Sequence, residues 1–288
     1  MSFRTDLASE AVADTVMSDE DVTVREERRG GVKWTYIRIR SRRGEERLGK
    51  PRGQYVTMEL PSLSDNDEEL AEHARRLGGE IRRLLPKAGT VLVVGLGNES
   101  ITPDAIGPQT VKGVLATRHI EGEFARSTGL DDLRPTVVMA TGVVGKTGVE
   151  SVEWVRGMCD VVHPSAVIAV DALASRSAER LGCTVQLCDG GIAPGSGVGN
   201  ARRALGREEL GVPVIALGVP TVVDARTLVA DWTDLPPETL PPPARADMMV
   251  TPREIDLIVQ RSARLLALAL NGALQPDYSP LELYSVAQ

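Results

Sequence analysis

The sequence is poor in the features that would place it outside the cytoplasm. Cysteine occurs only three times among 288 residues, at Cys159, Cys183 and Cys188. That is too few for the disulfide framework of a small secreted domain, so a reducing compartment is favoured. No apolar run approaches the roughly 20 residues of a transmembrane helix, and residues 1–21 lack the apolar segment of a secretion signal. We therefore expect a cytoplasmic protein with no membrane partner.

Histidine and aromatic residues are also scarce, and positive charge is in the minority. The three histidines, His73, His119 and His163, form no His-Glu-x-x-His motif, and no Cys-x2-Cys motif occurs. Zinc hydrolysis therefore lacks its usual ligands, and we interpret the histidines as structural and predict no metal or other cofactor. Aromatic residues make up 3% of the chain, so aliphatic side chains must fill the core. The net charge of −7 argues against a nucleic-acid partner.

The first ninety residues predict a hairpin, a further strand and a helix. Residues 1–20 are polar and acidic, and we expect them to be poorly structured. In residues 22–40, apolar residues roughly alternate with polar ones around a Gly-Gly turn, which is typical of a β-hairpin. Residues 54–60 can add a strand. Apolar residues at steps of three and four predict a helix over residues 64–85.

From residue 90 onward the pattern alternates strands with helices. Nearly continuous apolar strands indicate burial on both faces of a sheet. The predicted fold is a single α/β domain over residues 21–288, phosphorylase/hydrolase-like, with a mixed, mostly parallel central sheet flanked by helices and an N-terminal β-hairpin. Residues 232–247 are rich in proline and are expected to form a linker within it. The expected strands are 90–94, 136–140, 166–170, 184–187 and 213–217, and the expected helices are 107–117, 148–160 and 174–181.

Two aspartates each follow an apolar strand. Asp104 lies in the loop GLGNESITPDAIGP after residues 90–94, and Asp171 comes directly after residues 166–170. Ligands of open α/β sheets bind beyond the carboxyl ends of the strands, so these two carboxylates can converge there. Two close carboxylates cannot easily ionise together, and one acid with one base is what water-mediated amide hydrolysis requires. The alternative is that each aspartate is a helix N-cap.

A glycine-rich loop, DGGIAPGSGVGN at residues 189–200, follows another predicted strand. Such a loop lets backbone amides approach a ligand or a substrate chain closely. Ser196 is not in a Gly-x-Ser-x-Gly nucleophile motif, because Pro194 and Val198 occupy the glycine positions. The alternative is a surface Ω-loop without a binding role.

Residues 140–147, ATGVVGKT, nearly match the phosphate-binding loop Gly-x4-Gly-Lys-Thr. They lie between a predicted strand and a predicted helix, so Lys146 and Thr147 stand where that motif binds phosphate and magnesium. Asp171 would then help to hold the magnesium ion of an NTPase. This alternative leaves Asp104 and the glycine-rich loop without a role.

Several long motifs occur in the order found in the spore germination proteases. This family consists of aspartic-type endopeptidases of spore-forming bacteria. They are GLGNESITPDAIGP, TRHI, GVVGKTGVE, VIAVDALASRS, GIAPGSGVGN and GVPVIALGVPTVVDA, and RTDLASEA, GQYVTMEL and MMVTPREID extend the resemblance over nearly the whole chain. The resemblance implies an endopeptidase that degrades small acid-soluble spore proteins during germination, in the cytoplasm of the forespore or spore core. It also implies a homotetramer that is made as an inactive zymogen. One departure is that the segment after residues 222–225 is much shorter than is usual in the family.

The resemblance also assigns roles to individual residues. The family's catalytic aspartates lie in its TPDxLGP and IDALAxRS motifs, which match Asp104 and Asp171 here. The family is distantly similar to hydrogenase-maturation peptidases, in which a histidine helps to bind metal. Residues 189–200 contain no histidine, which favours an aspartate pair acting directly on water over a metal-dependent maturation peptidase. We predict that Asn98 orients the Asp104 loop and binds substrate. The other predicted substrate-binding residues are Gly195, Ser196, Gly197, Gly199 and Asn200.

The N-terminus fits a zymogen that cleaves itself. The family's substrates resemble one another at a cleavage site that reads acid, apolar residue, alanine, serine, acid, and the run Asp6-Leu7-Ala8-Ser9-Glu10 has that order. We predict that residues 1 to about 7 are removed at this site, with Asp6, Leu7 and Ala8 as the autoprocessing residues. Residues 1–20 are then propeptide-like. An ordinary disordered tail is the alternative.

Overall fold

The structure is a computed structural model that describes residues 5–13, 20–63, 69–195, 203–233, 239 and 248–287. Its strands are β1 (Val22–Arg29), β2 (Val32–Ile39), β3 (Gly53–Glu59), β4 (Val91–Leu96), β5 (Thr136–Gly142), β6 (Ala166–Ser175), β7 (Thr184–Cys188), β8 (Val214–Asp224) and β9 (Met249–Val250). Its α-helices are α1 (Ala8–Ala13), α2 (Arg42–Leu48), α3 (Leu70–Leu84), α4 (Ile106–Lys112), α5 (Gly122–Thr128), α6 (Val144–Thr147), α7 (Ser151–Val162), α8 (Arg207–Leu210), α9 (Ala225–Thr233), α10 (Ile255–Leu274) and α11 (Pro280–Ala287). Two short 3-10 helices are η1 (Thr102–Asp104) and η2 (Ala178–Arg180).

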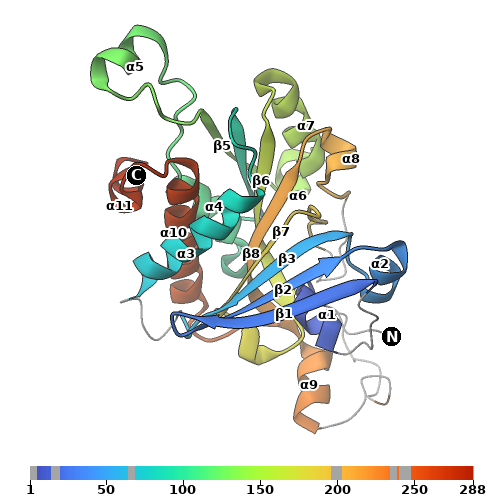
Figure 1. Cartoon of the computed structure of the whole chain (residues 1–288). Helices are drawn as coiled ribbons and strands as arrows, with labels where there is room; N and C mark the ends of the chain where they lie inside the picture. The colour runs from blue at the N-terminus through green and yellow to red at the C-terminus, as the bar shows by residue number, and fades with distance from the viewer. Residues whose placement is uncertain are drawn as a thin grey trace.

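The described strands form one mixed sheet in the order β1-β2-β3-β7-β8-β6-β4-β5, with β9 paired to β8. Figure 1 shows α3, α4 and α10 on one side of this sheet and α7 and α8 on the other. The pairings β4–β5, β4–β6 and β6–β8 are parallel. The pairings β1–β2, β2–β3, β3–β7, β7–β8 and β8–β9 are antiparallel.

The α/β class, the mixed sheet flanked by helices and the N-terminal hairpin are therefore confirmed, but parallel pairings are fewer than predicted. The reason lies in the hairpin. It continues into β3, and β3 joins the central strands by pairing antiparallel with β7. The hairpin thus enlarges the sheet instead of standing apart from it.

The central strands are buried on both faces because their apolar side chains alternate between two cores. In β4, Val91 and Val93 belong to the core that α3 and α10 cover, whereas Leu92 and Val94 belong to the core that α7 covers. All four side chains are fully buried. Each such side chain contributes roughly 1.5–3 kcal/mol to stability, which explains why the strand reads as a continuous apolar run.

One predicted helix is wrong. Residues 174–181 were expected to be helical, but β6 continues to Ser175, and only the short η2 follows. The strand continues because β8 is also long and pairs with β6 as far as Ser175 and Val223. As a result, Asp171 lies inside a strand and not at its end.

The predicted linker over residues 232–247 lies mostly outside the described residues. Trp232 and Thr233, at its start, belong to α9. No helix in the described part of the chain is long and apolar enough to span a membrane.

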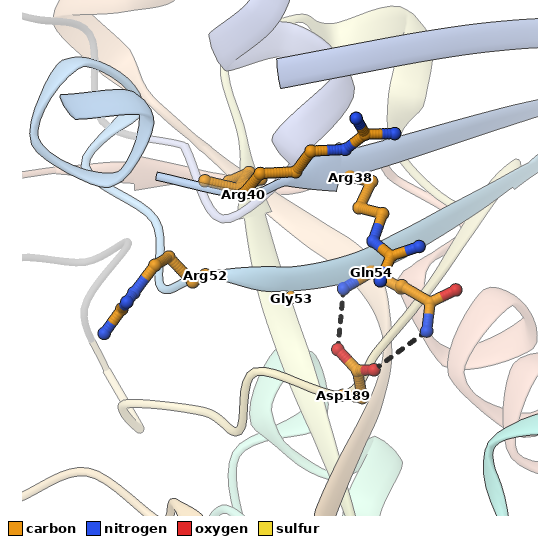
Figure 2. A pocket seen from close by; sticks show the side chains of 7 residues that line it. Arg38, Arg40, Arg52, Gly53, Gln54 and Asp189 are labelled. Atoms are coloured by element: carbon orange, nitrogen blue, oxygen red, sulfur yellow. Dashed lines mark hydrogen bonds between the residues drawn. The ribbon is translucent and has the colours of Figure 1, made fainter. Parts of the chain in front are cut away.

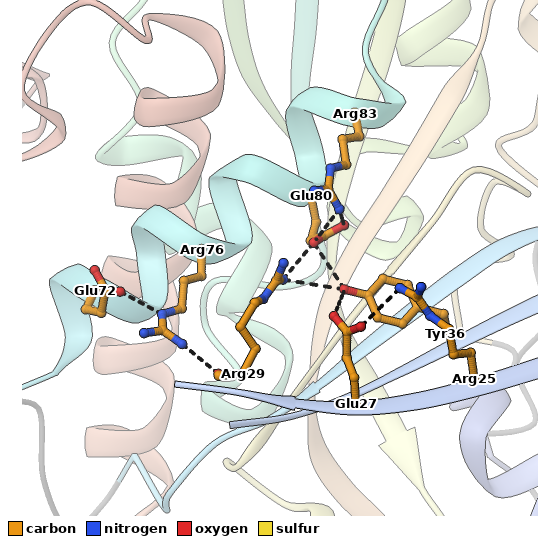
Figure 3. Close-up of polar contacts among 8 residues, drawn as sticks. All are labelled: Arg25, Glu27, Arg29, Tyr36, Glu72, Arg76, Glu80 and Arg83. Atoms are coloured by element: carbon orange, nitrogen blue, oxygen red, sulfur yellow. Dashed lines mark hydrogen bonds and ion pairs between the residues drawn. The ribbon is translucent and has the colours of Figure 1, made fainter. Parts of the chain in front are cut away.

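A network of charged groups fastens the N-terminal hairpin to α3 (Figure 3). Glu80 of α3 is only 4% exposed. Its Oε1 accepts hydrogen bonds from Arg29 Nη2 at 2.8 Å and from the Tyr36 hydroxyl at 3.2 Å. Arg83 donates to both carboxylate oxygens of Glu80, at 2.9 and 3.0 Å. Burial, together with the charge of Glu80, raises the pKa of Tyr36 to about 12, so its hydroxyl stays a donor.

Replacing Glu80 with Ala is expected to lower the free energy of unfolding by about 1–3 kcal/mol, because Arg29 and Tyr36 lose the buried acceptor that they share. Glu72 provides a matched control on the same helix. It pairs with Arg75 and Arg76, but its side chain is 41% exposed, so Glu72→Ala should lower the free energy of unfolding by much less than Glu80→Ala. Denaturant unfolding of both variants measures the difference, and equal losses would contradict the role given to Glu80.

Candidate active site

Asp171 lies in the middle of β6 and is 5% exposed. The pairing of β4 with β6 ends at Val170, so Asp171 begins the part of β6 that extends past β4. One carboxyl oxygen accepts a hydrogen bond from the N–H of Ala172 at 2.9 Å. Burial raises the pKa of Asp171 well above its usual range, and the charges of Asp104 and Asp6 raise it further. This carboxyl group therefore keeps its proton where an exposed aspartate is ionised.

Asp104 is held in place by its own loop, which follows β4. Its Oδ2 accepts a hydrogen bond from the N–H of Asn98 at 2.7 Å. Gly97 allows this close turn, because it adopts a φ of 108° and a β-carbon there would overlap the carbonyl oxygen of Asp104. The hydroxyl of Thr221 in β8 donates to the carbonyl oxygen of Pro103 at 2.7 Å. Asn98 thus holds Asp104 through its main chain, and its predicted contact with substrate stays a prediction.

The fold therefore brings the two predicted acids into electrostatic contact. Neither of them caps a helix. Asp104 is the last residue of η1, α4 has Ala105 at its N-cap without a side-chain bond, and Asp171 lies in a strand. The N-cap alternative is wrong for both. A carboxyl group that keeps its proton beside a second carboxylate can serve as the acid of an acid–base pair.

The N-terminal segment is the third part of this site. Residues 5–13 are ordered here, in contrast to the poorly structured tail that was predicted, because Leu7 and the residue after it are fully buried. The N–H of Asp6 donates to the carbonyl oxygen of Ala174 at 2.8 Å, and the N–H of Ala174 donates to Asp6 Oδ2 at 2.9 Å. The segment thus lies against the extended part of β6, where the Asp6 carboxylate influences Asp171.

Two further contacts hold the ends of this segment. Glu10 is buried and accepts hydrogen bonds from the N–H groups of Arg176 at 2.8 Å and Ser177 at 3.0 Å, directly after β6. Lys50 Nζ donates to the carbonyl oxygen of Thr5 at 2.6 Å. Burial lowers the pKa of Lys50. A lysine and two backbone amides therefore hold the two ends of the segment.

Gln186, which lies in β7, also belongs to this site, although it was not among the predicted residues. Its Nε2 donates to the carbonyl oxygen of Asp6 at 2.9 Å, and its Oε1 accepts from the N–H of Ala8 at 2.7 Å. One side chain thus binds the main chain on both sides of Leu7. The signal was a glutamine inside the apolar strand TVQLC, since a buried polar side chain needs hydrogen-bond partners.

The glycine-rich loop begins beside an open, basic pocket (Figure 2). Asp189 Oδ1 accepts a hydrogen bond from the N–H of Gln54 at 2.6 Å, and its Oδ2 accepts from Gln54 Nε2 at 3.2 Å. Gly195 has a φ of 73°, which favours glycine. The other lining residues of the pocket include Arg38, Arg40, Arg52 and Gly53. Ser196, Gly197, Gly199 and Asn200 lie outside the described residues, so the substrate-binding role of this loop stays a prediction.

Lys146 and Thr147 do not stand in a phosphate-binding loop. Both lie inside the four-residue helix α6, which ends at Thr147 and is capped by Gly148, whereas that motif places its loop before a helix. Lys146 Nζ donates to Ser100 Oγ at 2.6 Å. β4 separates β5, which precedes this motif, from β6, which carries Asp171. No group of three or more His, Cys, Asp or Glu side chains in the described ranges is arranged to hold a metal ion.

Known proteins match the chain over most of its length. Residues 4–236 match a family model described as germination protease. The chain is 41% identical to the germination protease of Caldanaerobacter subterraneus subsp. tengcongensis, over 98% of this chain and 97% of the relative. It is 36% identical to that of Clostridium acetobutylicum, over 96% of each chain, and 35% identical to that of Priestia megaterium, over 96% and 94%. The alignments with the first and last relatives span 318 and 352 positions, so these relatives carry residues that the 288-residue chain lacks.

Among solved structures, the chain is similar to the [NiFe] hydrogenase maturation protease HycI from Thermococcus kodakarensis KOD1, with a TM-score of 0.37 and 17% identity over 66% of this chain and 98% of that one.

Proposed function

This chain belongs to the germination protease family and is therefore a peptidase of germination, and we propose that it cleaves small acid-soluble spore proteins by an aspartic mechanism. The observation that carries the proposal is that Asp104 lies near the buried Asp171, whose pKa is raised by burial and then by the charge of Asp104. A polypeptide segment of the chain itself lies beside them, held against β6. An endopeptidase has to bind a polypeptide beside its catalytic groups, and the binding of this segment to β6 supports the proposal.

We assign different roles to the two acids. Asp171 keeps its proton because it is buried, so it donates a hydrogen bond and then the proton to the oxygen of the scissile carbonyl group. Asp104 accepts the N–H of Asn98 and acts as the base that takes a proton from water. The oxygen of that water forms a bond to the carbonyl carbon. When the C–N bond breaks, the proton on Asp104 passes to the leaving amine, and one hydroxyl of the intermediate returns a proton to Asp171 as the carbonyl group re-forms. Because the two carboxyl groups interact, they titrate as a pair.

The N-terminal segment supports the proposal that the chain is made as a zymogen. Asp6, Leu7 and Ala8 are bound against β6 and β7, where in this proposal they take the place of a substrate chain. Removal of residues 1 to about 7 by self-cleavage would open it. Mass spectrometry of the purified chain in mildly acidic buffer tests this step. An N-terminus that stays intact while the enzyme becomes active would contradict activation by self-cleavage.

Cleavage of a spore-protein peptide by the purified chain tests the function itself. The aspartic mechanism requires that activity survive a chelator and the substitution Lys146→Ala. Inhibition by the chelator would favour a metal-dependent peptidase, and loss of activity in the lysine variant would favour an NTPase. The proposed setting is the forespore or spore core, and the proposed assembly is a homotetramer, which light scattering measures.

A further inference from the structure

The N-terminal segment makes hydrogen bonds to two strands of the sheet, β6 and β7. On one side, the backbone of Ala174 in β6 exchanges two hydrogen bonds with Asp6. On the other side, the side-chain amide of Gln186 in β7 binds the carbonyl oxygen of Asp6 and the N–H of Ala8. Three of these four hydrogen bonds are made by main-chain atoms of the segment, and the fourth by the Asp6 carboxylate. A site that binds mainly main-chain atoms can accept chains of different sequence.

The register of the sheet places Gln186 and Asp171 on the same face. Asp171 and Gln186 are each the direct partner of Gly218 in the strand that lies between them, and direct partners share a face of the sheet. Neighbouring strands lie about 4.8 Å apart, so the two Cα atoms are roughly 10 Å apart. A β-carbon at Gly218 would come within 2.7 Å of the Asp171 carbonyl oxygen and of Leu173 Cγ. The strand between Asp171 and Gln186 therefore has no room for a side chain at position 218.

From this arrangement we propose that Gln186 is a substrate-positioning residue, whose amide clamps the substrate main chain on both sides of the residue that takes the place of Leu7. This role rests on the proposed function, because it belongs to the same site. The clamp fixes the position of the peptide relative to the catalytic groups. It thereby decides which peptide bond lies at Asp104 and Asp171.

Glutamine is the side chain that this clamp requires. It supplies one donor for a carbonyl oxygen and one acceptor for an N–H group, whereas glutamate supplies only acceptors and leucine supplies neither. Gln186 is 7% exposed while it holds the N-terminal segment. Departure of that segment leaves both ends of the amide without their partners, and an incoming main chain restores the same two bonds.

The test measures peptide binding, which does not depend on the chemical step. The probe is a fluorescein-labelled peptide with the sequence of residues 4–12, RTDLASEAV, and the readout is fluorescence anisotropy. The full-length chain carries Leu7→Asp, which removes the buried anchor of its own segment, and Asp171→Asn, which prevents cleavage. A second peptide has an ester in place of the Leu–Ala amide, so it lacks only the N–H that Gln186 Oε1 accepts.

With glutamine at position 186, the ester peptide should bind about 3- to 10-fold more weakly than the amide peptide. Gln186→Leu should weaken binding of the amide peptide by about 5- to 100-fold and abolish the difference between the two peptides. A merely structural role cannot produce that loss of difference. Gln186→Glu preserves size and the acceptor, so it should weaken binding but retain the ester effect, and it covers the case in which the leucine variant does not fold.

Thr57 supplies the matched control, because it is the direct partner of Gln186 in β3, is fully buried and has no hydrogen-bond partner for its hydroxyl. Thr57→Val should leave both affinities unchanged. An equal ester effect with leucine at 186, or no binding of the amide peptide, overturns the proposal. Binding that depends on Gln186, without cleavage by the chain that retains Asp171, overturns the proposed function but leaves the positioning role standing.

Discussion

Asp104→Asn and Asp171→Asn are each expected to lower kcat/KM for a spore-protein peptide by about 10²- to 10⁴-fold, which is what a positioned acid or base contributes. Asparagine cannot take a proton from water at position 104 and cannot deliver one at position 171. The fold should survive both changes. At position 171 the substitution removes an ionisable group from a buried site, so thermal stability should stay the same or rise.

Three comparisons make this result specific. Asp160→Asn changes an exposed aspartate on α7 and should leave kcat/KM unchanged. The double variant Asp104→Asn, Asp171→Asn should be scarcely slower than either single variant, because the two groups act as one unit. Circular dichroism confirms that each variant is folded. Cleavage at the parent rate by either single variant would show that the pair is not catalytic.

Local pattern was sufficient to locate the two acids. Asp104 follows β4, Asp171 lies inside β6 just beyond the end of its pairing with β4, and these two strands are parallel neighbours. Neighbouring parallel strands direct their carboxyl ends to the same edge, so residues that follow them meet there. The hairpin was equally readable, because alternation around a glycine turn is a local signal.

Contacts between segments that are far apart in the sequence could not be predicted from the local pattern of residues. Gln186 lies in an otherwise apolar strand, and its partners, Asp6 and Ala8, are about 180 residues away. The N-terminus was predicted to be poorly structured because it is polar and acidic, and the residues that hold the segment around Leu7 lie far away in the sequence. The length of β6 depended on β8 in the same way, since residues 172–175 are extended only because a partner strand continues beside them.

The raised pKa of Asp171 also has a consequence for stability that can be followed with pH. A group whose pKa is higher in the folded chain than in the unfolded chain binds its proton more tightly when folded. Its stabilising contribution is therefore complete below the unfolded value of about 3.9 and is lost as pH rises through the folded value. Asparagine does not titrate, so its variant escapes this loss.

We therefore expect Asp171→Asn to become progressively more stable than its parent as pH rises from about 4, by up to about 1.4 kcal/mol per pH unit until the raised pKa is passed. Both chains carry Asp104→Asn, so that neither can process its own N-terminus during the measurement. Burial is the first cause of the raised pKa of Asp171 and persists in this background. Urea unfolding between pH 4 and 8 gives the difference at each pH, and every other titrating group cancels because the two chains share it. A difference that does not change with pH would mean that Asp171 is ionised in the folded chain, and the acid of the proposed pair would then have to be assigned to another group.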